Sequence, residues 1–313
     1  MKKRVLIGSC GGLTGSYLTR QFRQLGCYVI GADAGERHVT RFFADQFVKL
    51  PVAKNERFIP ELLRVLNELQ VDYYIPTHSQ EIRAVSQNEA FLRQNWGGKF
   101  IVSPYETFLL LDDKKCGNVN LKAAGIPVPR MYESLQDVDR FPVFMKPNVG
   151  SGSKDSRKVE TLQLAEAFEA LYPNSTFYQC VSGTEYTVDC MFDDQGKLLG
   201  YNQRVREKSM GGAVIVTRNE YAFDILPYLK KLEAAFVFKG CVNFQYILCE
   251  GVPYFIDINL RYASGGLPLT VASGICVPQI MMDIFEGRPV GEIQSCSAEG
   301  RTMYRYFEEI FEG

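Results

Sequence analysis

Short apolar runs alternate with helical stretches over residues 1–111, and this alternation constrains the fold more than any other feature. The apolar runs are RVLIGSC, CYVIGAD, DYYIPTH and KFIVSP. Strands that alternate with helices pair in parallel, and the helices cover both faces of the sheet. The sequence therefore predicts a doubly wound, Rossmann-like parallel sheet in this N-terminal part.

The composition indicates a globular protein with more than one subdomain. The chain has 313 residues, of which 46% are hydrophobic, and its 35 basic residues nearly balance its 36 acidic ones. This balance disfavours binding to nucleic acid, and no apolar run approaches the length of a membrane span. We therefore expect a cytoplasmic protein whose partners are small molecules rather than nucleic acid or membrane.

Cysteine and histidine usage narrows the chemistry. The nine cysteines are scattered without a C-x-x-C pair, and the chain has only two histidines, His38 and His78. Zinc clusters and serine or cysteine triads therefore have little support. We expect reduced thiols in the core and a functional site built from oxygen and nitrogen ligands.

The glycine-rich turn Gly8–Gly15 follows the first predicted strand, and Asp33 ends the second. This arrangement resembles a dinucleotide-binding motif, in which the acid binds a ribose. The glycine spacing is irregular, however, and glycines between a strand and a helix often serve close packing only. We favour packing, and an NAD-dependent oxidoreductase remains an alternative.

The rest of the chain has a different pattern. The helical segment DDKKCGNVNLKAAG ends at Gly125, and the following IPVP keeps the backbone extended. Beyond it, the predicted strands include FPVFMKP, FYQCVSGTEYTVDCMF and KLLGYNQRVR, with helices between them. This pattern predicts an α+β region with antiparallel pairing.

Two neighbouring strands, GCVNFQYILC and YFIDINLR, carry polar residues at alternating positions. Side chains two residues apart share a face of a strand, so Asp257, Asn259 and Arg261 form one row. If the strands form a hairpin whose loop has an odd number of residues, such as residues 250–252, Gln245 lies on the same face. Magnesium favours oxygen ligands and arginine grips phosphate with two hydrogen bonds, so the row suits a phosphate-and-magnesium site. A solvated edge strand is the alternative.

Two further segments suit the same ligand. Lys146 ends an apolar strand and precedes PNVGSGSKDS, a loop whose backbone N–H groups are open to phosphate. In YQCVSGTEYTVD, we interpret the backbone around Gln179 as a contact for adenine and Glu185 as an acceptor for ribose hydroxyls. Taken singly, the first segment is at least as typical of a surface lysine beside a flexible turn, and the second is more typical of an ordinary strand with an exposed acid.

The order of these motifs resembles the ATP-grasp ligases, in the branch of carbamoyl-phosphate synthase large subunits and biotin carboxylase. The motifs are DKKCGNVNLKAAGIPVP, PVFMKPNVGSGS, QCVSGTEYTVD, GCVNFQ and FIDINLR, and the resemblance runs over nearly the whole chain. It implies a two-subdomain ATP-grasp fold over residues 112–313, with a small lid subdomain over residues 125–180. It identifies residues 1–111 as the domain that precedes this fold in the family.

The resemblance also implies a cofactor and a set of site residues. The cofactor is ATP with Mg²⁺, in whose place Mn²⁺ would serve. The implied nucleotide ligands are Lys114, Lys146, Gly150, Ser151, Gly152, Ser153, Gln179, Cys180, Val181 and Glu185. The implied magnesium ligands are Gln245, Asp257 and Asn259, and the implied catalytic residues are Arg261, Asp257 and Asn259. The family usually has Glu where Asp257 stands and Pro where Leu260 stands.

The chemistry that the resemblance implies is carboxylate activation. ATP phosphorylates a carboxylate to an acyl phosphate, and an amine then displaces phosphate to form a C–N bond. We therefore expect a carboxylate–amine ligase that takes small-molecule substrates, and a homodimer is compatible with this activity. A non-catalytic, ATP-binding regulatory protein would keep the same nucleotide residues and is a second alternative.

Acceptor residues are expected in the cleft between the domains. Arg204, Arg206 and Lys208 are candidates for a carboxylate clamp, with a solvated strand end as the alternative. His78 and Glu81 follow a predicted parallel strand, and ligands gather at the carboxyl ends of such strands. A plain loop is equally consistent with these two residues.

Overall fold

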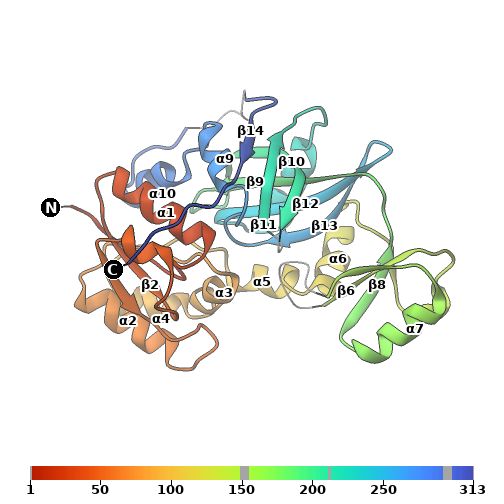
Figure 1. The fold of residues 1–313 in the computed structure, drawn as a ribbon, viewed down its shortest axis with the longest axis horizontal. Coiled ribbons are helices and arrows are strands. Elements are labelled where there is room, and N and C mark those ends of the chain that lie inside the picture. Colours follow the sequence, from red (N-terminus) through yellow and green to blue (C-terminus); the bar gives the residue numbers. More distant parts are fainter. Residues whose placement is uncertain (1, 149–154, 211–212, 292–297, 313) are drawn as a thin grey trace.

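Three β-sheets form the framework of the protein (Figure 1). The computed structural model describes residues 2–148, 155–210, 213–291 and 298–312. A parallel four-stranded sheet lies in the N-terminal part, and the six-stranded and second four-stranded sheets that follow are antiparallel. The sequence predicted this change from parallel to antiparallel pairing, and the structure confirms it.

The parallel sheet has the strand order β3-β2-β1-β4. The chain turns back past β1 to reach β4, and folds of this kind bind ligands in a crevice at the carboxyl ends of two such strands. Residues 99–104 form only an isolated bridge, between Lys99 and Tyr73, where a strand was predicted; the apolar residues there are buried without sheet pairing. The elements are β1 (Arg4–Ile7), α1 (Leu13–Gln24), β2 (Tyr28–Asp33), η1 (Val39–Phe42), β3 (Gln46–Lys49), α2 (Phe58–Glu68), β4 (Tyr73–Ile75), α3 (Ser79–Gln87), α4 (Glu89–Asn95) and α5 (Tyr105–Leu111).

A helix and a small antiparallel sheet come next in the chain. Asp113 caps α6, because its Oδ1 accepts from the Cys116 N–H at 2.9 Å, and Gly125, with a φ of 71°, follows the end of this helix. The sheet has the order β5-β8-β6-β7 and lies within the span predicted for a lid; the domain bounds themselves stay a prediction. The elements are α6 (Lys114–Ala123), β5 (Met131–Tyr132), η2 (Leu135–Asp137), β6 (Val143–Pro147), β7 (Arg157–Val159), α7 (Leu162–Leu171) and β8 (Ser175–Gln179).

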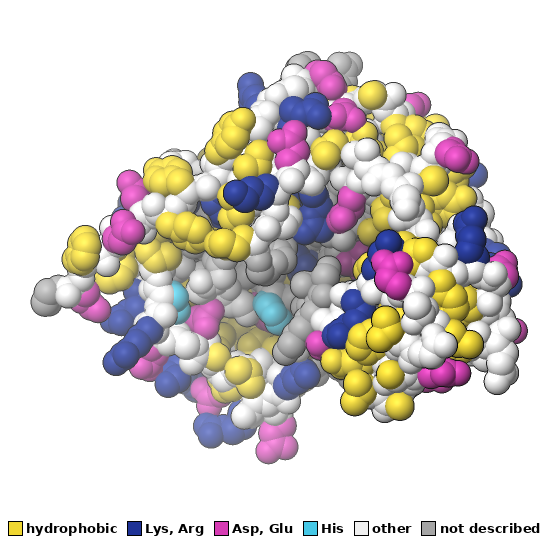
Figure 2. Space-filling view, turned by 45° about the vertical axis from the view of Figure 1, so that its right-hand side comes forward, with side chains coloured by type: hydrophobic (Ala, Val, Ile, Leu, Met, Phe, Trp, Pro, Cys, Tyr) yellow, Lys and Arg dark blue, Asp and Glu magenta, His cyan; other side chains and the backbone are white. Residues whose placement is uncertain are grey.

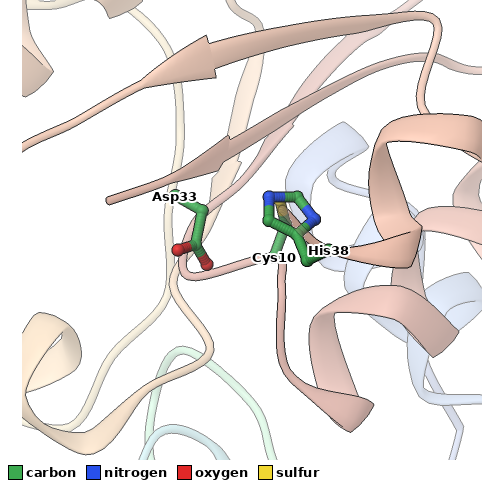
Figure 3. A group of neighbouring side chains, drawn as sticks. All are labelled: Cys10, Asp33 and His38. Carbon is green, nitrogen blue, oxygen red and sulfur yellow. The ribbon is translucent and has the colours of Figure 1, made fainter. Parts of the chain in front are cut away.

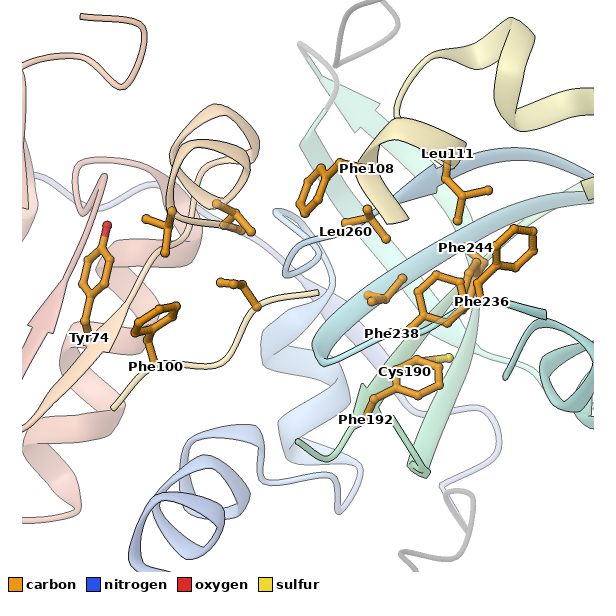
Figure 4. Close-up of a cluster of buried hydrophobic side chains, with 14 of the residues drawn as sticks. Tyr74, Phe100, Phe108, Leu111, Cys190, Phe192, Phe236, Phe238, Phe244 and Leu260 are labelled. Atoms are coloured by element: carbon orange, nitrogen blue, oxygen red, sulfur yellow. The ribbon is translucent and has the colours of Figure 1, made fainter. Parts of the chain in front are cut away.

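The six-stranded sheet, β13-β12-β9-β10-β11-β14, shares a continuous apolar core with the N-terminal domain. Figure 4 shows this core from Tyr74 and Phe100 through α5 to Phe244. Among the helices that the structure describes, none is long and apolar enough to cross a membrane. The elements are β9 (Thr184–Phe192), β10 (Leu198–Met210), β11 (Ala213–Asn219), α8 (Leu226–Ala235), β12 (Gly240–Cys249), β13 (Val252–Asn259), α9 (Leu267–Ala272), α10 (Val277–Glu286) and β14 (Thr302–Tyr304).

The β12–β13 hairpin has a two-residue turn where the sequence predicted an odd loop. Glu250 and Gly251 both have positive φ, 49° and 79°, as a type I′ turn requires. With this turn alone, the register would set Gln245 opposite Ile256. The predicted loop is therefore wrong, and the observed turn alone would place Gln245 on the face opposite to Asp257.

A β-bulge restores the alignment. The register shifts by one residue between Gln245 and Tyr246, with Ile256 as the extra residue on β13, and Gln245 pairs with Asp257. Directly paired residues share a face of a sheet. The predicted row of polar side chains on one face is therefore present, but through a bulge rather than through the loop.

Candidate functional site

A cavity of about 530 Å³ lies between the two antiparallel sheets. Its walls come from α6, β6 and β8 on one side and from β12 and β13 on the other. Figure 2 shows the surface hollowed near the middle of the view, with basic and acidic side chains in the hollow. A cavity of this volume suits a nucleotide-sized ligand. The predicted site residues that line it are Lys114, Lys146, Gln179, Cys180, Val181, Glu185, Gln245 and Asp257.

A row of hydrogen bonds runs from this cavity to the N-terminal domain. Lys114 Nζ donates to Asp257 Oδ1 at 2.9 Å, and Asn259 Nδ2 donates to Asp257 Oδ2 at 3.1 Å. Arg261 donates from Nη2 to Asn259 Oδ1 at 3.0 Å and from Nε to Ser79 Oγ at 2.9 Å. Ser79 begins α3, so the row joins the six-stranded sheet to the carboxyl edge of the parallel sheet.

Asp257 is ionised although it is largely buried. Burial acts to raise the pKa of Asp257, but the ammonium groups of Lys114 and Lys146 outweigh it and the net pKa is lowered. Lys114 Nζ therefore marks a position at which the protein stabilises positive charge beside the carboxylate. An ionised carboxylate of this kind is a suitable ligand for magnesium.

Lys146 faces Asp257 from the other sheet and is held by the bulge. Its Nζ donates to the carbonyl oxygen of Ile256, the extra residue on β13, at 2.8 Å. Burial lowers the pKa of Lys146 to about 8, and the charge of Lys114 adds to this lowering. Lys146 therefore changes its charge close to neutral pH, which an exposed lysine does not do.

The residues predicted to contact adenine and ribose lie at one end of the cavity. Gln179 ends β8, and Cys180 and Val181 continue from it along the cavity wall. Glu185 lies on β9, and its Oε1 accepts from Arg206 Nη1 at 2.7 Å. Arg206 thus lines the cavity, as a basic clamp requires, but it is paired with Glu185.

The loop predicted to cover the phosphates lies outside the described residues. Its predicted site residues are Gly150, Ser151, Gly152 and Ser153.

The sequence reasoning missed the apolar lining of the cavity, although alternation in VFMKP places Phe144 on the face of Lys146 and was a usable signal. The missed apolar residues include Phe144, Tyr178, Ile247, Phe255 and Ile258.

Two of the residues suggested for acceptor binding are buried instead. Arg204 is 2% exposed and binds Asp189 with two hydrogen bonds, Nε to Oδ2 at 3.0 Å and Nη2 to Oδ1 at 3.2 Å. Glu81 is 1% exposed, and its Oε1 accepts from the Tyr74 hydroxyl at 2.6 Å. The expectations for Arg204 and Glu81 are therefore wrong, because Arg204 binds Asp189 on the neighbouring strand β9 and Glu81 binds Tyr74 on β4.

The two remaining acceptor candidates lie on the surface. Lys208 is exposed on β10. His78 is also exposed, and its Nδ1 accepts from the Gln80 N–H at 3.3 Å to cap α3. Burial of part of the ring and the charge of Arg261 lower the pKa of His78, while Asp33 acts to raise it. His78 therefore lies next to Ser79, the residue through which Arg261 contacts the N-terminal domain.

The glycine turn after β1 is filled by the protein itself. Asp33 Oδ2 accepts from the Gly11 N–H at 2.8 Å, and Asp33 Oδ1 accepts from the Gly35 N–H at 2.9 Å. A Cβ atom added at Gly8 would lie only 1.8 Å from Glu81 Oε1. The geometry supports close packing as the reason for this turn, because the acid that would hold a ribose already binds the loop.

The C-terminal part of the chain matches a known family model. Residues 176–308 match the family model described as ATP-grasp in the biosynthetic pathway with Ter operon. The carbamoyl phosphate synthase large chain of Clostridium beijerinckii is 26% identical over 207 residues, which cover 59% of this chain and 19% of that protein. The D-alanine–D-alanine ligase of Fusobacterium nucleatum is 24% identical over 152 residues, 44% of this chain and 52% of that protein. The chain spans about a fifth of the length of the carbamoyl phosphate synthase large chains that it matches.

Solved structures share the fold at low sequence identity. N5-carboxyaminoimidazole synthetase from Staphylococcus aureus, complexed with ADP, has a TM-score of 0.74 at 15% identity and covers 95% of this chain and 81% of that one. The biotin carboxylase domain dimer of Hydrogenobacter thermophilus 2-oxoglutarate carboxylase, in complex with MgADP, has a TM-score of 0.72 at 18% identity, with 92% and 71% covered. L-amino acid ligase from Bacillus licheniformis has a TM-score of 0.69 at 17% identity, with 91% and 74% covered.

These likenesses confirm the predicted mixed α/β fold and the resemblance from which it was expected. The family model covers β8 to β14, the part of the chain that carries Asp257, Asn259 and Arg261. The curated relatives extend the match toward the N-terminus, up to 90% of the chain. Residues 176–308 therefore match an ATP-grasp family model, and the chain is similar to carbamoyl phosphate synthase large chains in sequence and to biotin carboxylases in fold.

Proposed function

We propose that this protein is an ATP-dependent ligase that activates a carboxylate as an acyl phosphate and joins it to an amine. The observation that carries the proposal is the hydrogen-bonded row of Lys114, Asp257, Asn259 and Arg261, which leads from the cavity to Ser79 on the N-terminal domain. A nucleotide in the cavity would have its phosphates at the first end of this row. An acceptor would reach the second end through the crevice of the parallel sheet.

The donor set fits magnesium. Asp257 supplies an ionised carboxylate, and Asn259 and Gln245 supply amide oxygens on the same face. Lys114 Nζ lies 2.9 Å from Asp257 Oδ1 and shows that a cation is stabilised there. Magnesium, when bound, neutralises phosphate charge, and Mn²⁺ prefers the same oxygen ligands. The MgADP in the Hydrogenobacter thermophilus carboxylase structure supports the same choice of cofactor.

The protein's own residues would act by position and charge. Lys146 on β6 and Lys114 on α6 would attract the phosphates from two sides of the cavity. Arg261 is fixed by hydrogen bonds to Asn259, Ser79 and the Tyr262 carbonyl, so its guanidinium offers a preorganised charge to the transferred phosphoryl group. This arrangement requires no side-chain nucleophile, which agrees with a chain that has two histidines.

The bonds and charges of the two steps balance without a further reactant. A carboxylate oxygen attacks the terminal phosphorus of ATP, ADP leaves and an acyl phosphate forms. The amine nitrogen then attacks the acyl carbon, inorganic phosphate leaves and the nitrogen gives up a proton to solvent. Two of the similar proteins are named as a D-alanine–D-alanine ligase and an L-amino acid ligase, which supports amino acids or related compounds as substrates.

An ADP-release screen over paired carboxylates and amines tests the proposal, with hydroxylamine as a substitute nucleophile. We expect ADP and a trapped hydroxamate in the presence of magnesium. Release of AMP and pyrophosphate would replace the acyl phosphate with an adenylate. Tight MgATP binding without turnover on any pair would favour the regulatory alternative.

Sedimentation would test the expected homodimer, which the dimeric carboxylase domain supports.

A further inference from the structure

A second cluster of ligand atoms lies at the carboxyl edge of the parallel sheet, and the ligase chemistry leaves it without a role. Cys10 follows β1, Asp33 ends β2 and His38 precedes η1, and Figure 3 shows the three side chains together at these strand ends. One ligand atom from each residue lies within 4.8 Å of the other two. Cys10 is distant in the sequence from Asp33 and His38, so the sequence pattern did not group the three.

His38 is the clearest sign of a missing ligand. Both ring nitrogens are buried, and neither has a hydrogen-bond partner within the part of the chain that the structure describes. Burying a polar group without a partner is destabilising, and native proteins rarely do so. The ring packs edge-on against Phe47, with centroids 5.1 Å apart. An apolar contact thus holds the imidazole while its nitrogens stay open to a ligand.

Asp33 is already oriented beside the imidazole. The N–H groups of Gly11 and Gly35 each bind one of its oxygens and leave further lone pairs available. A Cβ atom at Gly11 would lie 3.0 Å from Asp33 Oδ2 and 3.1 Å from His38 Cγ, so glycine permits the close approach. Backbone hydrogen bonds to a carboxylate are typical of the outer shell that supports metal ligands.

We propose that Cys10, Asp33 and His38 bind one divalent cation, for which Zn²⁺ is the best match. Thiolate, imidazole and carboxylate are the three ligand types that zinc accepts, and three protein ligands leave one position for water or another group. As the metal–sulfur bond forms, the Cys10 thiol releases its proton to solvent. The site does not depend on the proposed ligase activity.

Hydrogen bonds connect the cluster to the segment at which the polar row ends. Thr77 Oγ1 donates to the carbonyl oxygens of Gly8 and Ser9, at 2.8 and 3.1 Å, and Thr40 Oγ1 donates to the carbonyl oxygen of Cys10 at 2.7 Å. Thr77 is two residues before Ser79, which binds Arg261. A bound cation would therefore stiffen the loop after β1, which Thr77 connects to the segment that contacts Arg261.

Cobalt(II) absorption tests the proposal on the full chain without nucleotide. After treatment with a chelator, one equivalent of Co²⁺ should produce a thiolate-to-cobalt charge-transfer band, and Zn²⁺ should abolish it by displacement. Cys10→Ser should remove the band, and His38→Gln should weaken Co²⁺ binding by at least about tenfold, the scale on which even outer-shell partners act. Cys180→Ser is the matched control, because it removes a thiol from the nucleotide cavity, and it should keep the band.

Two results would overturn the proposal: a wild-type protein without the band, or a band that survives Cys10→Ser. If Cys10→Ser does not fold, His38→Gln decides, since it changes a half-buried side chain and keeps a similar size. Unchanged Co²⁺ affinity in that variant would exclude the site. The readout needs neither ATP nor turnover, so its failure and the failure of the ligase proposal are distinguishable.

Discussion

The turn after β1 and the face of the β12–β13 hairpin both combine glycine with acidic residues, yet the protein uses them in opposite ways. Around the turn, Asp33 binds backbone N–H groups and Glu81 occupies the space beside Gly8. On the hairpin, Asp257 borders an open cavity and is surrounded by cationic groups. The difference teaches that an acid near a glycine loop indicates a nucleotide only where a cavity of nucleotide size lies beside it.

The largest expected effect is on the hairpin side, from Asp257→Asn. Turnover of the substrate pair found by the ADP screen should fall about 100-fold or more, as when one preorganised electrostatic group is removed. The dissociation constant of ADP should change far less, because the lost charge acts mainly on the metal and the transferring group. Steady-state kinetics and calorimetric titration measure the two quantities.

Asp194→Asn is the matched control for this variant, because it removes an exposed acid in the β9–β10 turn. Its turnover should equal that of the wild type. Full turnover in Asp257→Asn would mean that the hairpin face is only a solvated strand. The two regions would then not differ in function.

The next effect is a pH dependence that belongs to Lys146. Its pKa is about 8, so the ammonium is charged below that pH and loses its proton above it. If ADP binds only the charged form, affinity should fall roughly tenfold between about pH 7 and pH 9. Calorimetric titration across this range should show the fall in the wild type.

Two variants at this position separate charge from packing. Lys146→Arg stays charged throughout the range and should give a flat profile, whereas Lys146→Ala should be both weaker and flat. Lys122→Ala, at an exposed lysine at the end of α6, should keep the wild-type profile. A wild-type slope in Lys146→Ala would assign the titration to another group.

On the other side of the comparison, Gly8→Ala should affect stability. The new Cβ would clash with Glu81 Oε1, and such overpacking costs about 1–3 kcal/mol of the free energy of unfolding. Gly12→Ala, in the same turn, is the control, since the nearest atom to its Cβ is the Ser9 carbonyl oxygen at 4.0 Å. Thermal denaturation should therefore show a lower Tm for Gly8→Ala alone. Loss of ADP binding in a folded Gly8→Ala would mean that the turn holds the nucleotide after all.

The last expected effect is a pH dependence of stability that belongs to the buried Glu81. Burial raises its pKa from 4.5 to about 7, so between these values the folded state holds a proton that the unfolded state has lost. This group's contribution to stability therefore declines as the pH rises through that window. Glu81→Gln has no such proton, and its Tm should decline less than that of the wild type between about pH 5 and pH 8. An identical decline in the two proteins would mean that Glu81 ionises normally.

Local patterns in the sequence were sufficient for the polar row and for the change of fold class. Alternation along β13 alone places Asp257, Asn259 and Arg261 on one face, because it depends on the strand's own geometry. Alternation of strands and helices likewise predicts the parallel sheet. The apolar residues near 100–102 show the limit, since they are buried without forming the predicted strand.

The remaining features depend on partners that lie far away in the sequence. Nothing in the segment around Arg204 shows that Asp189 on the neighbouring strand binds it. The local sequence does not predict the bulge at Ile256 either. The carbonyl oxygen of Ile256 accepts a hydrogen bond from Lys146, which lies 110 residues earlier. The cluster of Cys10, Asp33 and His38 forms only when the ends of two parallel strands meet.

The hydrogen bond from Lys146 to the carbonyl oxygen of Ile256 links the two antiparallel sheets. Ile256 has no partner in the described β12–β13 register. The hydrogen bond to Lys146 can therefore break without loss of a residue pair between β12 and β13. A polyphosphate that attracts the Lys146 ammonium would therefore break this hydrogen bond between the two sheets. An uncharged molecule of the same size would leave the hydrogen bond intact. The spacing of the two sheets is thus expected to report the charge of the occupant, and to do so before any chemistry takes place.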